Sequence, residues 1–206
     1  MRNQQDEKPR PDQPQPKATN LLALRQKVIS MTSEAMLRDA YFSRERVVRL
    51  LSSNLPRKNP QKAAEILLNH KSRLEKSVEE KATRQRKMPR LYYPPDLPII
   101  RSRNQIVQAI KDNRVIIVSG ETGCGKSTQL PKMCLEAGQG VAGKIACTQP
   151  RRLAAITIAQ RIADELHQPL GQVVGYKIRF PDRTSPSCYL KISTDYVPDR
   201  LMVEVH

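Results

Sequence analysis

The sequence predicts an α/β fold in its C-terminal half, preceded by a helical region and a polar tail. Three observations indicate this arrangement. An apolar, β-branched run at residues 114–119 leads directly into a glycine-rich loop and then into a helical pattern. Apolar residues between positions 21 and 68 recur at helical spacing. Residues 1–20 contain four prolines and no large apolar residue after Met1, so we expect this tail to be disordered.

The composition limits the class of protein. The 206 residues include 36 Lys and Arg against 20 Asp and Glu, a net charge of +16. Residues 1–90 alone carry a net +11. Such an excess is typical of a protein with a polyanionic partner, and charge kept for solubility is the alternative. No apolar run approaches the ~18 residues of a membrane helix, and the four irregularly spaced cysteines are read as reduced thiols. We therefore expect a cytoplasmic protein without a membrane segment.

The helical region is expected over residues 21–88. A first helix is predicted from Leu21, with Asn20 as its N-cap, and a second apolar cluster follows from Tyr41. Asn59-Pro60 is typical of a helix start. The region ends in a basic run that is either a solvated helix end or a patch facing phosphates: Lys81, Arg84, Arg86, Lys87 and Arg90. The proline-rich residues 89–98 form an extended linker and the domain boundary.

The strongest signal lies at the start of the second half. A short helix is predicted at Gln105–Lys111, and residues 114–119 read as a strand buried on both faces. Then comes a complete G-x-x-x-x-G-K-[ST] pattern, made of Gly120, Glu121, Thr122, Gly123, Cys124, Gly125, Lys126 and Ser127 and followed by Thr128. Glycines let a loop wrap a phosphate, and the following helix adds its positive end. Lys126 would reach the outer phosphates, and Ser127 would offer a hydroxyl to Mg²⁺.

A second segment narrows the choice among nucleotide-binding proteins. Residues 144–148 read as a strand, which Gln149, Pro150, Arg151 and Arg152 follow before a helix to Leu166. Cations are disfavoured at a helix N-terminus. Their position here therefore indicates that the two arginines face an anion.

Together these segments resemble motifs I and Ia of the DEAH-box RNA helicases, especially the bacterial HrpA-type subgroup. GETGCGKSTQLPK, TQPRRLAA, AQRIADEL and VGYKIRF carry the resemblance, which extends over residues 36–192. It implies a RecA-like P-loop domain with a parallel sheet that uses ATP and Mg²⁺ on RNA. The implied ATP contacts are the loop residues Gly120–Thr128, with Arg161 stacking on adenine. The implied contacts with the RNA backbone come from the TQPRR segment, that is from Thr148, Gln149, Arg151 and Arg152.

The family pattern stops after Ile192. Tyr196 stands where the family has glycine, Pro198 would block the next helix, and no Asp-Glu-Ala-His sequence occurs. We therefore expect residues 99–206 to be a truncated, incomplete RecA-like domain that lacks the carboxylates needed for hydrolysis. A non-enzymatic basic RNA-binding fragment is the alternative reading. A small P-loop kinase is disfavoured by the TQPRR segment.

Overall fold

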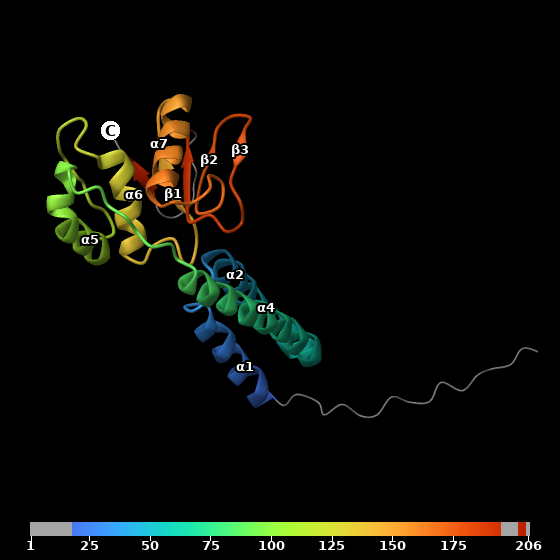
Figure 1. The fold of residues 1–206 in the computed structure, drawn as a ribbon. Coiled ribbons are helices and arrows are strands. Elements are labelled where there is room, and N and C mark those ends of the chain that lie inside the picture. The colour runs from blue at the N-terminus through green and yellow to red at the C-terminus, as the bar shows by residue number, and fades with distance from the viewer. Residues whose placement is uncertain (1–17, 195–201, 205–206) are drawn as a thin grey trace, which may run out of the picture.

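The computed structural model describes residues 18–194 and 202–204. Residues 1–17 of the tail predicted to be disordered, and the interruptions at Tyr196 and Pro198, lie outside the described residues. The prediction is wrong for residues 18–20, which form the start of a helix. The chain forms an α/β structure in which an elongated helical part is followed by a part that carries the sheet (Figure 1). No helix among the described residues is long and apolar enough to cross a membrane.

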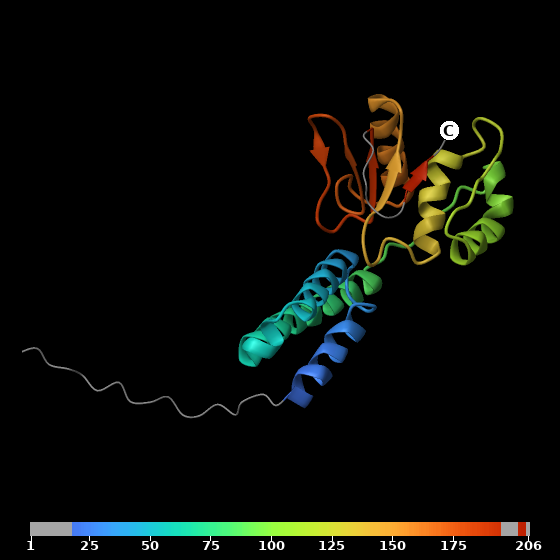
Figure 2. The same cartoon turned by 180° about the vertical axis from the view of Figure 1, so that it is seen from behind.

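Four helices make the first part: α1 (Ala18–Met31), α2 (Leu37–Ser52), α3 (Leu55–Lys58) and α4 (Pro60–Arg86). Asn59 caps α4, because its side-chain oxygen accepts a hydrogen bond from the Lys62 backbone N–H at 2.9 Å, as predicted. The predicted cap at Asn20 is wrong, since α1 begins at Ala18 and Asn20 lies inside it. Figure 2 shows α2 packed along α4, with α1 crossing beside them. Their core consists of Val28, Ala35, Val47, Leu50, Ala63, Leu67 and Leu74.

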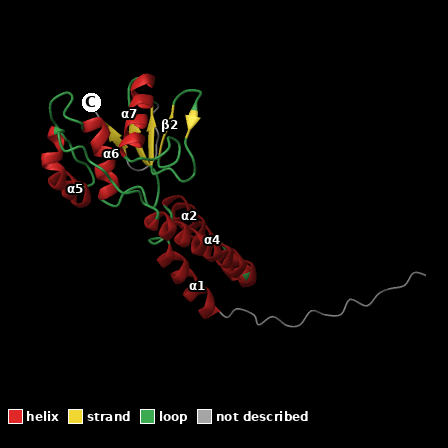
Figure 3. Cartoon of the chain, in the orientation of Figure 1, coloured by secondary structure: helices red, strands yellow, loops and turns green. Residues whose placement is uncertain are grey.

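The second part begins with a short 3₁₀ turn (Pro98–Ser102), α5 (Arg103–Asp112) and α6 (Lys126–Glu136). Then come β1 (Ile145–Thr148), α7 (Arg152–Glu165), β2 (Val174–Lys177), β3 (Asp182–Arg183), β4 (Leu190–Ser193) and β5 (Met202–Glu204). The helix at 105–111, the strand at 144–148 and the helix after Arg152 are confirmed. Figure 3 shows the helices of this part lying beside its strands.

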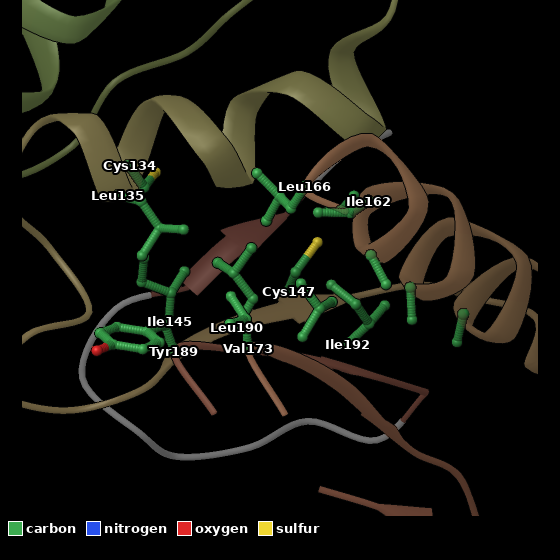
Figure 4. Packing of buried hydrophobic residues seen from close by; sticks show 14 of the residues in the cluster. Cys134, Leu135, Ile145, Cys147, Ile162, Leu166, Val173, Tyr189, Leu190 and Ile192 are labelled. Carbon is green, nitrogen blue, oxygen red and sulfur yellow. The ribbon is translucent and has the colours of Figure 1, made fainter. Parts of the chain in front are cut away.

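The strands form one mixed sheet in the order β3-β2-β4-β1-β5. The pairing of β2 with β3 is antiparallel and the other three pairings are parallel, so the expectation of a parallel sheet holds except at this edge. Side chains of α6 and α7 pack on the strands, as Figure 4 shows for Leu135, Ile162, Ile145 and Leu190. Cys134 and Cys147 belong to this core, and burial raises the pKa of the Cys147 thiol to about 11.

The predicted strand at residues 114–119 is wrong. The segment has no strand partner among the described residues and runs as a loop between α5 and α6 (Figure 1). Val115 and Ile117 are 81% and 93% exposed, whereas Ile116 and Val118 pack against α5 and α6. A strand needs a neighbour with free backbone groups, and both sides of β1 are already taken by β4 and β5. The alternating burial of the side chains in this segment therefore comes from packing against helices rather than from a sheet.

The side chain of Arg84 joins the two parts, beside a backbone hydrogen bond from Leu37 N–H to the Ala142 carbonyl oxygen at 2.7 Å. Arg84, near the end of α4, is 7% exposed and donates to the carbonyl oxygens of Gly140 and Val141 at 3.0 Å. It also donates to those of Pro186, Ser187 and Cys188 at 3.1–3.3 Å. Its guanidinium lies 4.3 Å from the centre of the Tyr189 ring. Arg84 therefore does not belong to a phosphate-facing patch, since its donors are used inside the protein.

Candidate nucleotide and RNA site

The glycine-rich loop ends where α6 begins. Gly123 has φ +84° and Gly125 has φ +102°, a left-handed backbone that favours glycine. A side chain at Gly125 would also come within 3.1–3.3 Å of Leu97, Ile99 and Gln129, whereas the space beside Gly123 is open. The backbone thus turns sharply into α6, whose first N–H groups have no acceptor within the helix. This is the geometry of an anion cradle.

Lys126 is the first residue of α6 and folds back over the loop. Its ammonium donates to the carbonyl oxygens of Gly120 at 2.6 Å and Glu121 at 2.9 Å, and lies 3.8 Å from the Cys124 sulfur. Ser127 is half-buried beside it, and Thr128 is buried and donates to the Gly125 carbonyl oxygen at 3.2 Å. Glu121 and Thr122 are exposed. The Lys126 ammonium thus lies over the glycine-rich loop.

The second motif connects β1 with α7. Thr148 ends β1, and the backbone N–H of Gln149 donates to the Ser193 carbonyl oxygen at 2.8 Å. The Gln149 side chain is buried, whereas Arg151 and Arg152 are exposed at the start of α7. The sequence interpretation grouped all four residues as RNA contacts. Of these, the two arginines are the groups that reach solvent with free donors.

A buried network that sequence reasoning missed ties α6 to α7. Lys132 is fully buried, and its ammonium contacts the Glu165 carboxylate at 2.5 Å and the Tyr92 carbonyl oxygen at 2.6 Å. Gln129 donates to the same Glu165 oxygen at 3.0 Å. The other Glu165 oxygen accepts from the Arg161 guanidinium at 3.1 Å. Glu165 therefore holds the residue expected to stack on adenine and fixes the helix that follows the glycine-rich loop.

The charge state of this network follows from its contacts. Burial alone would raise the pKa of Glu165, but hydrogen bonds from Lys132 and Gln129 hold it below its usual range. Burial lowers the pKa of Lys132, and the carboxylate offsets part of that shift. Sequence reasoning could not find this network, because Glu165 lies 36 positions after Gln129 and 33 positions after Lys132. No local spacing rule links residues that far apart.

Metal ligands are sparse in this region. No group of three or more His, Cys, Asp or Glu side chains that could hold a metal ion occurs within residues 18–194. A magnesium ion at the loop would therefore depend on the Ser127 hydroxyl and on ligand oxygens. This donor set fits a cation bound together with a nucleotide rather than a dedicated protein cage.

Comparison with known proteins gives one consistent result. The chain is 40% identical over 188 residues, 88% of its length, to the ATP-dependent RNA helicase HrpA of Escherichia coli. The chain is thus similar in sequence to ATP-dependent RNA helicases of the HrpA type. It is also 50% identical over 105 residues to an HrpA homologue of Haemophilus influenzae, and over 101 residues to the probable ATP-dependent RNA helicase DHX40 of Homo sapiens. No family model matches the chain.

The chain spans only a small part of the length of these relatives. Its matched residues cover 14% of the Escherichia coli helicase, 8% of the Haemophilus influenzae protein and 13% of human DHX40. The activity, substrates and partners of the complete helicases therefore come to this chain as proposals.

Proposed function

We propose that this chain is the ATP-binding and RNA-contacting portion of an ATP-dependent RNA helicase and does not by itself complete the hydrolytic site. In this proposal residues 99–206 form part of a RecA-like domain, residues 89–98 are its linker, and residues 21–88 are a basic helical region. The observation that carries the proposal is the left-handed turn at Gly123 and Gly125 leading into α6 with Lys126 at its start. Homology to ATP-dependent RNA helicases supports the same reading.

The loop residues have separate roles toward ATP. The backbone of Gly120–Gly125 would surround the phosphates, and the first turn of α6 would supply N–H donors. Lys126 would exchange the carbonyl oxygens of Gly120 and Glu121 for phosphate oxygens, which its short contacts with the loop place within reach. Ser127 would bind Mg²⁺, and Thr128 would hold the turn through Gly125. ATP with Mg²⁺ supplies the phosphoryl group of helicase chemistry.

Arg161 is proposed to stack on adenine, with Glu165 as the residue that orients it. Its guanidinium side chain is 59% exposed and linked to Glu165 through Nε, which leaves its plane open to a flat ring. Because Glu165 also accepts from Lys132 and Gln129, it is fixed from the protein side.

Arg151 and Arg152 are the proposed contacts with the RNA backbone. Two exposed guanidiniums at the N-terminus of α7 raise the local positive potential where the helix end is already positive. A phosphate relieves that repulsion and accepts hydrogen bonds from both. Thr148 and Gln149 would then position this turn, Gln149 through its bond to Ser193.

Hydrolysis needs a carboxylate to hold Mg²⁺ and a group to orient the attacking water. The described residues bring no acidic cluster together that could hold a metal, and the sequence has no Asp-Glu-Ala-His segment. We therefore propose binding without efficient turnover by this chain. A basic RNA-binding fragment without nucleotide affinity is the alternative, which the following experiment tests.

The test is calorimetric titration of the chain with Mg²⁺-ATP. Lys126→Ala should weaken binding at least about tenfold, because it removes a charge-assisted contact to phosphate. Lys111→Ala, an exposed lysine of α5, is the matched control and should leave the affinity unchanged. Equal ATP affinity in all three proteins, or none in the wild type, would contradict nucleotide binding by the loop.

A further inference from the structure

A solvent-facing aromatic ring lies among cationic side chains on the seam between α2 and α4. Phe42 is 37% exposed, and the guanidinium carbons of Arg73 and Arg46 lie 4.5 Å and 5.1 Å from its ring centre. The His70 ring lies 5.9 Å from that of Phe42. In sequence these residues are up to 31 positions apart, so the cluster exists only because the two helices pack side by side (Figure 1).

Hydrogen bonds to Asp39 of α2 hold the Arg73 guanidinium in place. Arg73 donates to one oxygen of Asp39 through two nitrogens, at 2.8 Å and 2.9 Å. Asp39 is 5% exposed and accepts a further hydrogen bond from the Ser77 hydroxyl at 2.9 Å. Ser77 in turn accepts from the backbone N–H of Met36 at 3.0 Å. Arg73 is thereby fixed with its guanidinium carbon over the Phe42 ring, so this pair loses little entropy on binding a further flat ring.

Two of the cations beside this stack have no ion-pair partner among the described carboxylates, whereas Arg38 and Arg73 both pair with Asp39. Arg46 and Lys76 are exposed, and neither forms an ion pair with a described carboxylate. Lys76 lines an open depression of about 420 Å³ together with Arg38, Asn69 and Arg73. Asp39 and Glu80 also border it, but Asp39 is occupied by Arg73 and Ser77. Burial and the charges of Arg46 and Arg73 lower the pKa of His70, as expected in a positive field.

We propose that this surface, the Phe42 face (Arg38, Phe42, Arg46, Asn69, Arg73 and Lys76), binds single-stranded RNA. Aromatic and guanidinium planes stack on bases of any sequence, and neighbouring cations neutralise the phosphates between them. Arg46 and Lys76 take phosphates, while Phe42 and Arg73 take a base. The Phe42 face lies on the helical part and is separate from the glycine-rich loop and from Arg151 and Arg152. The inference goes beyond the proposed function and does not depend on nucleotide binding.

The experiment measures binding of a fluorescently labelled oligouridylate to the 206-residue chain, without nucleotide, by anisotropy at several salt concentrations. Arg46→Glu/Lys76→Glu should weaken binding about tenfold or more and lower the slope of log affinity against log salt by about 1.4. Phe42→Leu keeps an apolar side chain but loses the ring. It should weaken binding at least about fivefold with the salt slope unchanged. Both effects should persist when Arg151→Ala and Arg152→Ala are also present.

Arg25→Glu/Arg44→Glu is the matched control, since it makes the same change of net charge at exposed arginines outside the Phe42 face. Circular dichroism checks that each variant keeps its helices. An equal loss of affinity in the two charge-reversal variants would overturn the proposal, because binding would then follow net charge alone. Unchanged RNA affinity in Phe42→Leu would overturn it as well, and is the result expected if the face instead binds an acidic peptide.

Discussion

Arg84 shows how one side chain can decide the relation between two parts of a chain. Its five donors meet the carbonyl oxygens of two loops, one before β1 and one before β4, and its own carbonyl accepts from Tyr189 at 2.7 Å. In the sequence it is one of five closely spaced cations, so nothing local separates it from Arg86, which is 70% exposed. Only the folded loops reveal which arginine is structural.

Arg84→Met should therefore lower the free energy of unfolding by at least about 3 kcal/mol, because several buried carbonyl oxygens lose their donor. Arg86→Met on the same helix should change it by less than about 0.5 kcal/mol. Urea unfolding of both variants beside the wild type measures the difference. Similar stability of the two variants would show that Arg84 is not the junction.

Glu136 makes a second residue-scale prediction, on pH. Two hydrogen bonds from Arg103 and one from Tyr93 hold its pKa below the ordinary 4.5. A lowered native pKa contributes stability above the unfolded value, and that contribution is lost as the pH falls through the native value. Glu136→Gln should therefore cost about 1 kcal/mol at neutral pH and progressively less below pH 4.5. Thermal midpoints of both proteins over this range measure it, and a constant difference would count against the assignment.

At the scale of elements, residues 114–119 show that an apolar pattern can predict a strand that the topology of the sheet does not form. Its continuous apolar, β-branched run predicts a strand buried on both faces, but the segment is buried on one side only, since Ile116 and Val118 face α5 and α6 while Val115 and Ile117 face solvent. A strand, however, also requires a free edge, and no sequence pattern states which edges the sheet has left. By contrast, the helix start at Asn59-Pro60 was predicted correctly because a cap is a local property, and the run to Thr148 is a strand because β4 and β5 lie on either side of it.

The candidate site divides in the same way. The glycine-rich loop and the exposed Arg151 and Arg152 follow from short-range spacing, and sequence reasoning found them. Glu165 and its partners on α6, and Phe42 under Arg73, depend on helices brought together by the fold, and it missed them. Sequence therefore identifies the glycine-rich loop better than the distant side chains that hold its helix in place.

Substitutions in the 114–119 segment test its packing. Val115→Thr/Ile117→Thr should change the free energy of unfolding by less than about 0.5 kcal/mol, since both side chains already face water. Ile116→Thr/Val118→Thr should cost about 2 kcal/mol, because it places hydroxyls against the apolar surface of α5 and α6. Urea denaturation compares the two. Equal losses would instead indicate a strand buried on both faces.

For the whole molecule, positive charge is plentiful while acidic groups that could hold a metal are not brought together in the described residues. Residues 1–90 carry a net +11, and the sheet-bearing part holds the glycine-rich loop. Binding groups for phosphates are thus abundant, whereas the described residues assemble no acidic metal cluster beside Ser127. We therefore propose that this chain binds ATP and RNA but does not hydrolyse ATP efficiently.

The most direct test is phosphate release from ATP by the purified chain, with and without saturating single-stranded RNA, beside Lys126→Ala. We predict that the wild type and Lys126→Ala release phosphate at the same background rate and that RNA accelerates neither, because the residues that the structure describes bring together no acidic cluster for metal and water. RNA-stimulated release by the wild type that is lost in Lys126→Ala would contradict the account and show that these 206 residues contain a complete catalytic site.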